Sequence, residues 1–441
     1  MQFASETESI ASSRPLVRNL AWNIVGESMP VLAAVFAIPI LVRSLGADRF
    51  GVLMLSWMVA GYFGLFDFGL GRALTKLMAR ELSLAHHGKS ASLFWTALIM
   101  MLTFGASAAV ILAILAPLLA HVALRIPIAL QPETLAGFYV IALGLPFLVS
   151  ASALRAALTA AERFDSLNLI RTPAGILSFA APLLMLPFTH RLGWLIATLM
   201  LNRALSWAIY FAAVLRTMPS LRSRVSFDRA AIRPLLGFGG WITISNLITP
   251  LMVYLDRFVI GMTVSMAALT AYSVPMEIIS KSFILPAAIS GVMFPAFARN
   301  LATLPEDVCR LFERAVKLVS AILLPLCLMI VTFAPQIMSF WMGRKFALES
   351  SRQSSTVLQI LAAGAFVTGL SWIPLALLHA AHRPDLTAKL HLADFPLYAI
   401  TLWILIHHYG LAGAAFAWSG RLLAENIVLF AMARRVVARP L

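Results

Sequence analysis

Charged residues and cysteines are both scarce in this sequence of 441 residues. Asp, Glu, Lys and Arg make up only 12% of the chain, whereas hydrophobic residues make up 61%. So little polar surface cannot coat a water-soluble globule, which excludes a soluble protein and leaves lipid as the solvent. The two cysteines, Cys309 and Cys327, lie near or inside a predicted membrane span, and we interpret both as packing residues rather than a disulfide.

Motifs for enzyme chemistry are missing as well. The chain has no phosphate-binding loop, no HExxH, no GxSxG and no paired-cysteine metal site. His379, His382 and His391 gather around one predicted loop, but their spacing is too loose to favour a metal site. We therefore expect a protein that is not an enzyme, with no catalytic residues, no metal and no cofactor.

Apolar runs long enough to cross a bilayer recur along the whole chain. A transmembrane helix needs about 20 residues, and the stretches between these runs are too short for a soluble domain. The sequence predicts an all-α, polytopic membrane protein with about twelve transmembrane helices. The predicted spans are 20–42, 50–70, 93–120, 135–156, 167–188, 194–215, 235–259, 266–296, 316–339, 356–379, 392–407 and 411–431.

The spacing of these runs divides the chain into two halves with equal numbers of spans. We predict a tail at residues 1–19, a first six-helix bundle at 20–215, a basic linker at 216–233, a second six-helix bundle at 234–431 and a tail at 432–441. Each half opens with a polar helix that contains proline. This pattern favours an internal repeat about an axis along the membrane normal.

Basic residues are unevenly distributed among the predicted loops. Most of the 34 Lys and Arg residues fall in loops on the same side as the amino terminus. Cationic loops resist translocation, so both termini are predicted to be cytoplasmic. The first residues carry Glu6 and Glu8 without a positive segment, so we expect no cleavable signal peptide. The net charge of +15 is interpreted as topogenic and lipid-facing, and no nucleic-acid partner is expected.

Several polar side chains fall inside predicted spans, where lipid makes them costly, so they are expected to face a cavity or a partner. Asn19, Asn23 and Glu27 recur every four residues and form a polar stripe on the first span. A hydrogen-bonded seam between helices is the alternative explanation of this stripe. In the eighth span, Glu277 and Lys281 share one face, and we favour a cavity role over a purely structural ion pair.

The seventh span is also unusually polar. It carries Asn246 in its earlier part, and Asp256 and Arg257 near its outer end. Arg257 can either contact a ligand or extend to the lipid head groups. Arg43, at the corresponding end of the first span, has the same two alternatives.

Other charged residues lie near or inside three further spans. Arg72 follows Asp67 at the inner end of the second span, where an interfacial position is the main alternative to a binding role. Arg203 falls inside the sixth span. Arg421 and Glu425 fall inside the last span, where their alternative role is to exchange charges across the bundle.

Three short stretches carry a more specific pattern than composition alone. They are residues 19–51, with PILVRSLG at 39–46 followed by Phe50-Gly51, the run DFGLGRAL at 67–74, and the run YLDRFVIG at 254–261, which leads to Ala271-Tyr272. With these motifs, the chain resembles the bacterial polysaccharide or O-antigen flippases of the multidrug, oligosaccharidyl-lipid and polysaccharide exporter superfamily. The length and the number of spans match that family along the whole chain.

The resemblance implies a V-shaped pair of six-helix bundles that alternates between inward-open and outward-open states in the bacterial cytoplasmic (inner) membrane. Its cargo would be a polyprenyl-pyrophosphate-linked oligosaccharide, which moves from the cytoplasmic to the outer leaflet during surface polysaccharide synthesis. Membrane lipids and other proteins of polysaccharide assembly would be its further partners.

A cargo head with phosphates needs cations and polar donors in its path. The expected substrate-binding residues are Lys281, Arg257, Arg43, Arg72, Arg203, Asn23 and Asn246. Four acidic residues would hold these cations in the empty site or bind a coupling proton or sodium ion. They are Glu27, Asp67, Asp256 and Glu277, and the sequence does not separate the two roles.

Two other functions compete with this interpretation. A drug or cation exporter of the same superfamily would need a cavity dominated by acidic and aromatic residues, whereas basic residues match or exceed acidic ones here. A membrane-embedded polysaccharide polymerase or ligase would need a large outer loop with catalytic residues, and the predicted outer loops are short.

Overall fold

The computed structural model describes residues 29–64, 69–84, 86–222, 225–237, 240–303, 305–342, 344–381 and 383–438. Almost all of these residues are helical, and the described ranges contain no strand. The predicted all-α class is therefore confirmed.

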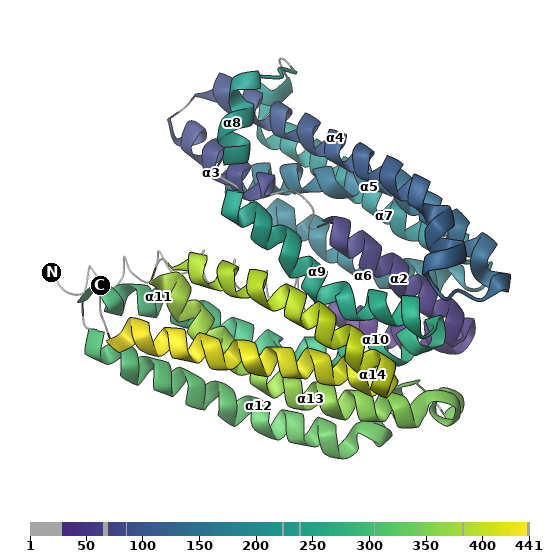
Figure 1. Cartoon of the computed structure of the whole chain (residues 1–441). Coiled ribbons are helices and arrows are strands. Elements are labelled where there is room, and N and C mark those ends of the chain that lie inside the picture. Colours follow the sequence, from purple (N-terminus) through teal and green to yellow (C-terminus); the bar gives the residue numbers. More distant parts are fainter. Residues whose placement is uncertain are drawn as a thin grey trace. The chain divides into compact units, whose positions relative to one another are not determined.

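The helices follow one another with short connections, as Figure 1 shows. The first helices are Met29–Leu45, α2 (Ala47–Gly64), α3 (Leu70–Ser83), α4 (His87–Leu118), α5 (Gln131–Ala160), α6 (Phe164–Met185), α7 (Leu192–Thr217) and α8 (Arg229–Gly237). The later helices are α9 (Gly240–Thr263), α10 (Met266–Ser282), α11 (Ile284–Thr303), α12 (Pro305–Met342), α13 (Arg344–Ala380) and α14 (Pro384–Ala438). Short π and 3-10 turns lie at Leu119–Ala123, Ile128–Leu130 and Pro219–Arg222.

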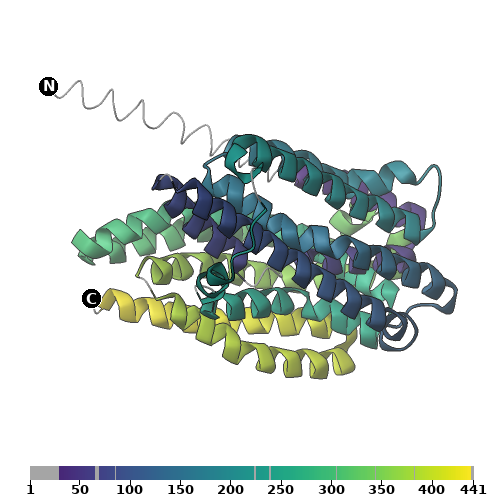
Figure 2. The same cartoon turned by 90° about the horizontal axis from the view of Figure 1, so that it is seen from above.

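Within the described residues, 8 helical segments are long and apolar enough to cross a membrane. The last of them, Asp385–Val436, is a hairpin rather than one rod, because Gly410 interrupts α14 with a φ of 57° and a ψ of −133°. Glycine reaches such a conformation readily since it has no Cβ. The two arms of α14 match the predicted spans at 392–407 and 411–431, and Figures 1 and 2 show them side by side.

Some predicted spans are divided in the structure. The span predicted at 266–296 consists of α10 and α11, which meet at Phe283. Pro286 explains this break, because proline has no N–H to donate to the carbonyl of Ser282. The span predicted at 50–70 is described by α2 up to Gly64 and by the start of α3 at Leu70, and residues 65–68 lie outside the described residues.

The helices form two compact units. The first unit contains the described residues of 1–45, 56–122 and 128–246, and the second contains 46–55, 123–127 and 247–441. The division falls inside α9, after the linker predicted at 216–233. The domain limits predicted from the sequence remain a prediction.

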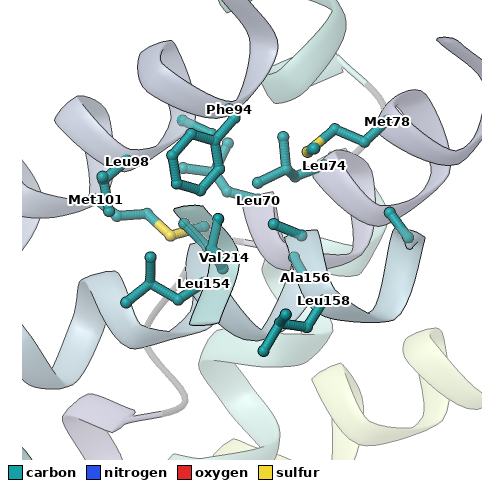
Figure 3. Packing of buried hydrophobic residues seen from close by; sticks show 14 of the residues in the cluster. Leu70, Leu74, Met78, Phe94, Leu98, Met101, Leu154, Ala156, Leu158 and Val214 are labelled. Atoms are coloured by element: carbon teal, nitrogen blue, oxygen red, sulfur yellow. The ribbon is translucent and has the colours of Figure 1, made fainter. Parts of the chain in front are cut away.

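In the first unit, α4 and α5 pack together and α5 also packs on α7 (Figure 1). Their core includes Leu74, Phe94 and Leu154, each with none of its surface exposed. Figure 3 shows this cluster, in which Phe94 and Leu98 of α4 lie close to Leu70 and Leu74 of α3. Such apolar interlocking holds the helices, while their outward faces remain apolar enough for lipid.

In the second unit, α13 packs against α10, α11, α12 and α14. Leu323, Ile373 and Leu377 are fully buried in its core. The start of α2 also belongs to this unit, where the Thr270 hydroxyl donates a hydrogen bond to the Ala47 carbonyl at 2.7 Å. A Cβ on Gly51 would overlap the carbonyl oxygen of Met266, so glycine is required for this close approach.

Candidate functional site

Charged side chains from α9, α10 and α14 gather inside the second unit. Asp256 of α9 is 0% exposed and its neighbour Arg257 is 7% exposed. Burying an ion is costly unless it is hydrogen-bonded or paired, so these residues need compensating partners.

The Asp256 carboxylate is held by neutral donors. Its Oδ2 accepts a hydrogen bond from the Tyr272 hydroxyl at 2.6 Å, and its Oδ1 accepts one from the backbone N–H of Arg257 at 2.7 Å. Tyr272 comes from α10 and is itself fully buried. Sequence reasoning assigned no site role to Tyr272, although it lies at the end of the motif that starts at Tyr254.

The Arg257 guanidinium is less completely satisfied. Its Cζ lies 5.6 Å from the centre of the Tyr254 ring, in cation–π geometry. Its Nε is buried and has no hydrogen-bond partner among the described residues. Asp256 and Glu277 act on it electrostatically. Arg257 is therefore a buried cation with a spare donor, which suits an anion.

Glu277 and Lys281 form the i, i+4 ion pair that their spacing suggests. The Lys281 Nζ lies 3.2 Å from Glu277 Oε2, and their side chains are 33% and 22% exposed. Both are thus half-buried on α10, and the Glu277 carboxylate is near enough to Arg257 to act on it electrostatically. The geometry allows both a structural pair and a binding site, so their functional role remains a prediction.

The hairpin α14 contributes a second group of charges. Arg421 Nη1 lies 3.3 Å from Asp394 Oδ2 on the other arm and 3.5 Å from Glu425 Oε2 on its own arm. His391 Nε2 lies 3.1 Å from Glu425 Oε1. The Arg421 guanidinium also lies 4.9 Å from the centre of the Tyr398 ring. The exchange of charges weighed for Arg421 and Glu425 is present, and it includes Asp394.

Sequence reasoning missed Asp394 and Tyr398. The missing signal is the turn at Gly410, which folds α14 into two arms and brings residues of one arm against the other. Asp394 lies before the turn and Arg421 after it, and Arg421 Nη1 donates to Asp394 Oδ2 across the hairpin. Only the position of the turn makes that pairing visible in the sequence.

The two groups of charges are connected. Arg421 of α14 acts electrostatically on Asp256 of α9, and Tyr398 is close to both Asp256 and Arg257. We call the residues Asp256, Arg257, Glu277, Lys281, Asp394, Arg421, Glu425 and His391 the second-unit charge network. It joins α9, α10 and both arms of α14 within one unit.

The first unit contains a group of arginines. Arg203, in the middle of α7, is close enough to Arg155 of α5 for their like charges to interact. Arg155, Arg171 and Arg203 all act electrostatically on Tyr210, whose hydroxyl donates a hydrogen bond to the Leu167 carbonyl at 3.4 Å. Three cations from three helices therefore converge on one tyrosine.

The other predicted site residues are placed as follows. Arg43 lies near the end of the helix Met29–Leu45 and Arg72 lies in the first turn of α3, and both side chains are exposed. Asn246 lies in α9, but its side chain is outside the described set. The positions of Asn23, Glu27 and Asp67 lie outside the described residues. In the described part of the chain, no group of three His, Cys, Asp or Glu residues could hold a metal ion.

Apolar helices, a two-unit architecture and charges buried within the bundle define a polytopic membrane protein of the transporter class. The fold is similar to that of an inward-facing multidrug resistance MATE family transporter of the MOP superfamily, with a TM-score of 0.74 and 16% identity over 94% of this chain and 98% of that one. That fold has twelve helices in two bundles, which confirms the predicted architecture. A MOP superfamily transporter from Pyrococcus furiosus is similar at a TM-score of 0.65 and 18% identity, over 96% and 95% of the two chains.

The family follows from the sequence. Residues 40–352 match the model of a polysaccharide biosynthesis protein family, and the chain belongs to this family. A Shigella flexneri protein named as a proposed O-antigen transporter is 27% identical over 94% of this chain and 96% of its own length. Family and relative point to a transporter rather than an enzyme.

Proposed function

We propose that the protein moves a polyprenyl-pyrophosphate-linked oligosaccharide from the cytoplasmic to the outer leaflet of the bacterial inner membrane, for O-antigen, capsule or exopolysaccharide synthesis. Membership of the polysaccharide biosynthesis family and the similarity to the Shigella flexneri relative support this cargo class. The distribution of basic residues supports an orientation with both termini in the cytoplasm.

The convergence of Arg155, Arg171 and Arg203 in the first unit is the observation that carries the proposal. The Arg155 side chain is partly buried, whereas those of Arg171 and Arg203 are exposed. A group of cations on one helical bundle attracts an anionic ligand. Guanidinium groups bind phosphate oxygens with two parallel hydrogen bonds, which suits a pyrophosphate. Arg257 in the second unit offers a similar donor.

In this proposal a proton or sodium gradient supplies the energy, and the cargo moves by alternating access. Glu27, Asp67, Asp256 and Glu277 are the residues expected to bind a proton or sodium ion, or to pair with the cations when no cargo is bound. A resident cofactor has no role in this scheme. Partners would be the lipid-linked cargo, membrane lipids and other proteins of polysaccharide assembly.

Export of drugs or organic cations is the second candidate, because the fold is also that of MATE transporters. The sign of the charges argues against it. An organic cation would be repelled by the arginines around Tyr210, whereas a phosphate would be attracted.

Deletion of the gene in its host tests the proposal. We expect lipid-linked oligosaccharide to accumulate in the inner leaflet while the corresponding surface polysaccharide disappears, and the wild-type gene to reverse both effects. Unpolymerised units accumulating outside would instead indicate a polymerase or ligase. Unchanged polysaccharide together with increased drug sensitivity would favour the cation exporter.

A further inference from the structure

The fixed charges of the second-unit charge network do not balance. Its carboxylates belong to Asp256, Glu277, Asp394 and Glu425, whereas its permanent cations are Arg257, Lys281 and Arg421. The network therefore has one more carboxylate than permanent cations. An excess negative charge in a low-dielectric bundle is costly and attracts a positive charge.

His391 is placed to supply that charge. Its Nε2 lies 3.1 Å from Glu425 Oε1, and the two side chains are 23% and 12% exposed. With Nε2–H donating to the carboxylate, Nδ1 is the ring atom that can gain a proton. Protonation would form a half-buried ion pair and make the network neutral. Histidine is the side chain that ordinarily changes its charge near neutral pH.

The groups that face His391 from neighbouring elements agree with this role. Asp394 and Glu425 of α14 act on it with negative charges, and His379 of α13 adds a second imidazole. Arg421 is connected to His391 by Glu425, which pairs with both side chains. The charged pairs of α12, Asp307 with Arg310 and Glu313 with Lys317, are exposed and pair along their own helix.

Two further atoms show that the hydrogen bonds of this region are incomplete. The Tyr398 hydroxyl and the Arg421 Nε are buried without a hydrogen-bond partner in the part of the chain that the structure describes. Tyr398 is only 2% exposed and lies under the Arg421 guanidinium. A small displacement of the Arg421 side chain can therefore form new hydrogen bonds with buried polar groups. This suits a side chain with two alternative positions.

We propose that His391 and Glu425 form a proton-binding site that couples proton entry to the transport cycle, with Arg421 transmitting its state to α9. The coupling role rests on the proposed function, whereas proton binding does not. The imidazole Nδ1 accepts a proton from a hydronium ion of the aqueous phase, an O–H bond of that ion breaks to leave water, and the imidazolium pairs with Glu425. Glu425 then attracts Arg421 less, so Arg421 interacts more strongly with Asp394 and Asp256.

Two substitutions at His391 separate this role from a structural one. His391→Gln fixes a neutral side chain and His391→Lys fixes a positive one that can keep the ion pair with Glu425. Because coupling needs both charge states, each variant is expected to lower surface polysaccharide at least tenfold at normal membrane abundance. His407→Gln is the matched control, since His407 is exposed on the same hairpin. Wild-type export by His391→Lys would show a structural ion pair and overturn the proposal.

Proton binding can be measured without any cargo. The full-length protein, labelled with carbon-13 in its histidine rings and reconstituted in lipid nanodiscs, is titrated by NMR, and the signal absent from His391→Gln is His391. We expect this signal to move as the pH is lowered, because protonation changes the chemical shifts of the imidazole ring carbons. A signal that stays at one position overturns the proton site. A signal that titrates in a protein that fails to restore polysaccharide contradicts the proposed function instead.

Discussion

At the scale of single residues, burial decides which side chains are sensitive to substitution. Asp256 is fully buried, and its Oδ2 depends on the Tyr272 hydroxyl. Sequence alone identified Asp256 but not this donor, because the contact joins two helices whose rotation is fixed only in three dimensions.

Tyr272→Phe removes that donor and leaves a buried carboxylate oxygen unsatisfied. The cost is expected to be about 1–3 kcal/mol of folding free energy, which should lower the melting temperature of the purified protein. Tyr409→Phe is the matched control, since Tyr409 is exposed. Equal melting temperatures for the two variants would show that the hydrogen bond contributes nothing to stability.

Lys281→Ala is expected to abolish export while the protein remains in the membrane at normal abundance. The substitution removes a cation from α10 and leaves Glu277 without its 3.2 Å partner. Surface polysaccharide and membrane abundance are measured together in the deletion strain. Lys389→Ala, which breaks an exposed pair with Asp385, is the control with near-normal export. Near-normal export by Lys281→Ala would remove Lys281 from the transport pathway.

At the scale of helices, hydropathy predicted most spans well, because a run of apolar residues is sufficient to place a helix in lipid. The breaks were harder to predict. Phe283 separates α10 from α11 inside one continuous apolar run, and many other prolines in this chain sit inside helices without dividing them. Whether a proline bends or ends a helix depends on the partners of the freed carbonyl, which sequence does not show.

The motif Phe50-Gly51 has a physical explanation at this scale. A Cβ on Gly51 would overlap the Met266 carbonyl oxygen, so Gly51→Ala must push α2 away from the start of α10. We expect a cost of about 1–3 kcal/mol and a lower melting temperature. Gly291→Ala is the control, because the space around Gly291 is open. A Gly51→Ala protein as stable as this control would contradict the close approach.

At the scale of the whole molecule, the charged site residues belong to both units. The first unit presents arginines around Tyr210, whereas the second contains a nearly balanced set of acids and bases. This difference favours a response to the coupling proton in the second unit, beside the phosphate-binding role proposed for arginines of both units. Composition predicted the membrane class, and short motifs predicted the family. The charge network depends on the hairpin geometry of α14 and could not be predicted from either.

The central claim is transfer of a lipid-linked sugar across the bilayer by this chain. Its most direct test uses the purified full-length protein in liposomes that contain a polyprenyl-pyrophosphate lipid with a fluorescent sugar in both leaflets. Membrane-impermeant dithionite reduces only the dye that is exposed outside. With the wild-type protein and an imposed proton gradient, we expect the inner-leaflet signal to be lost as well, and Lys281→Ala vesicles to retain it. Full protection of the inner-leaflet signal in wild-type vesicles, under proton and sodium gradients of either direction, would contradict the account.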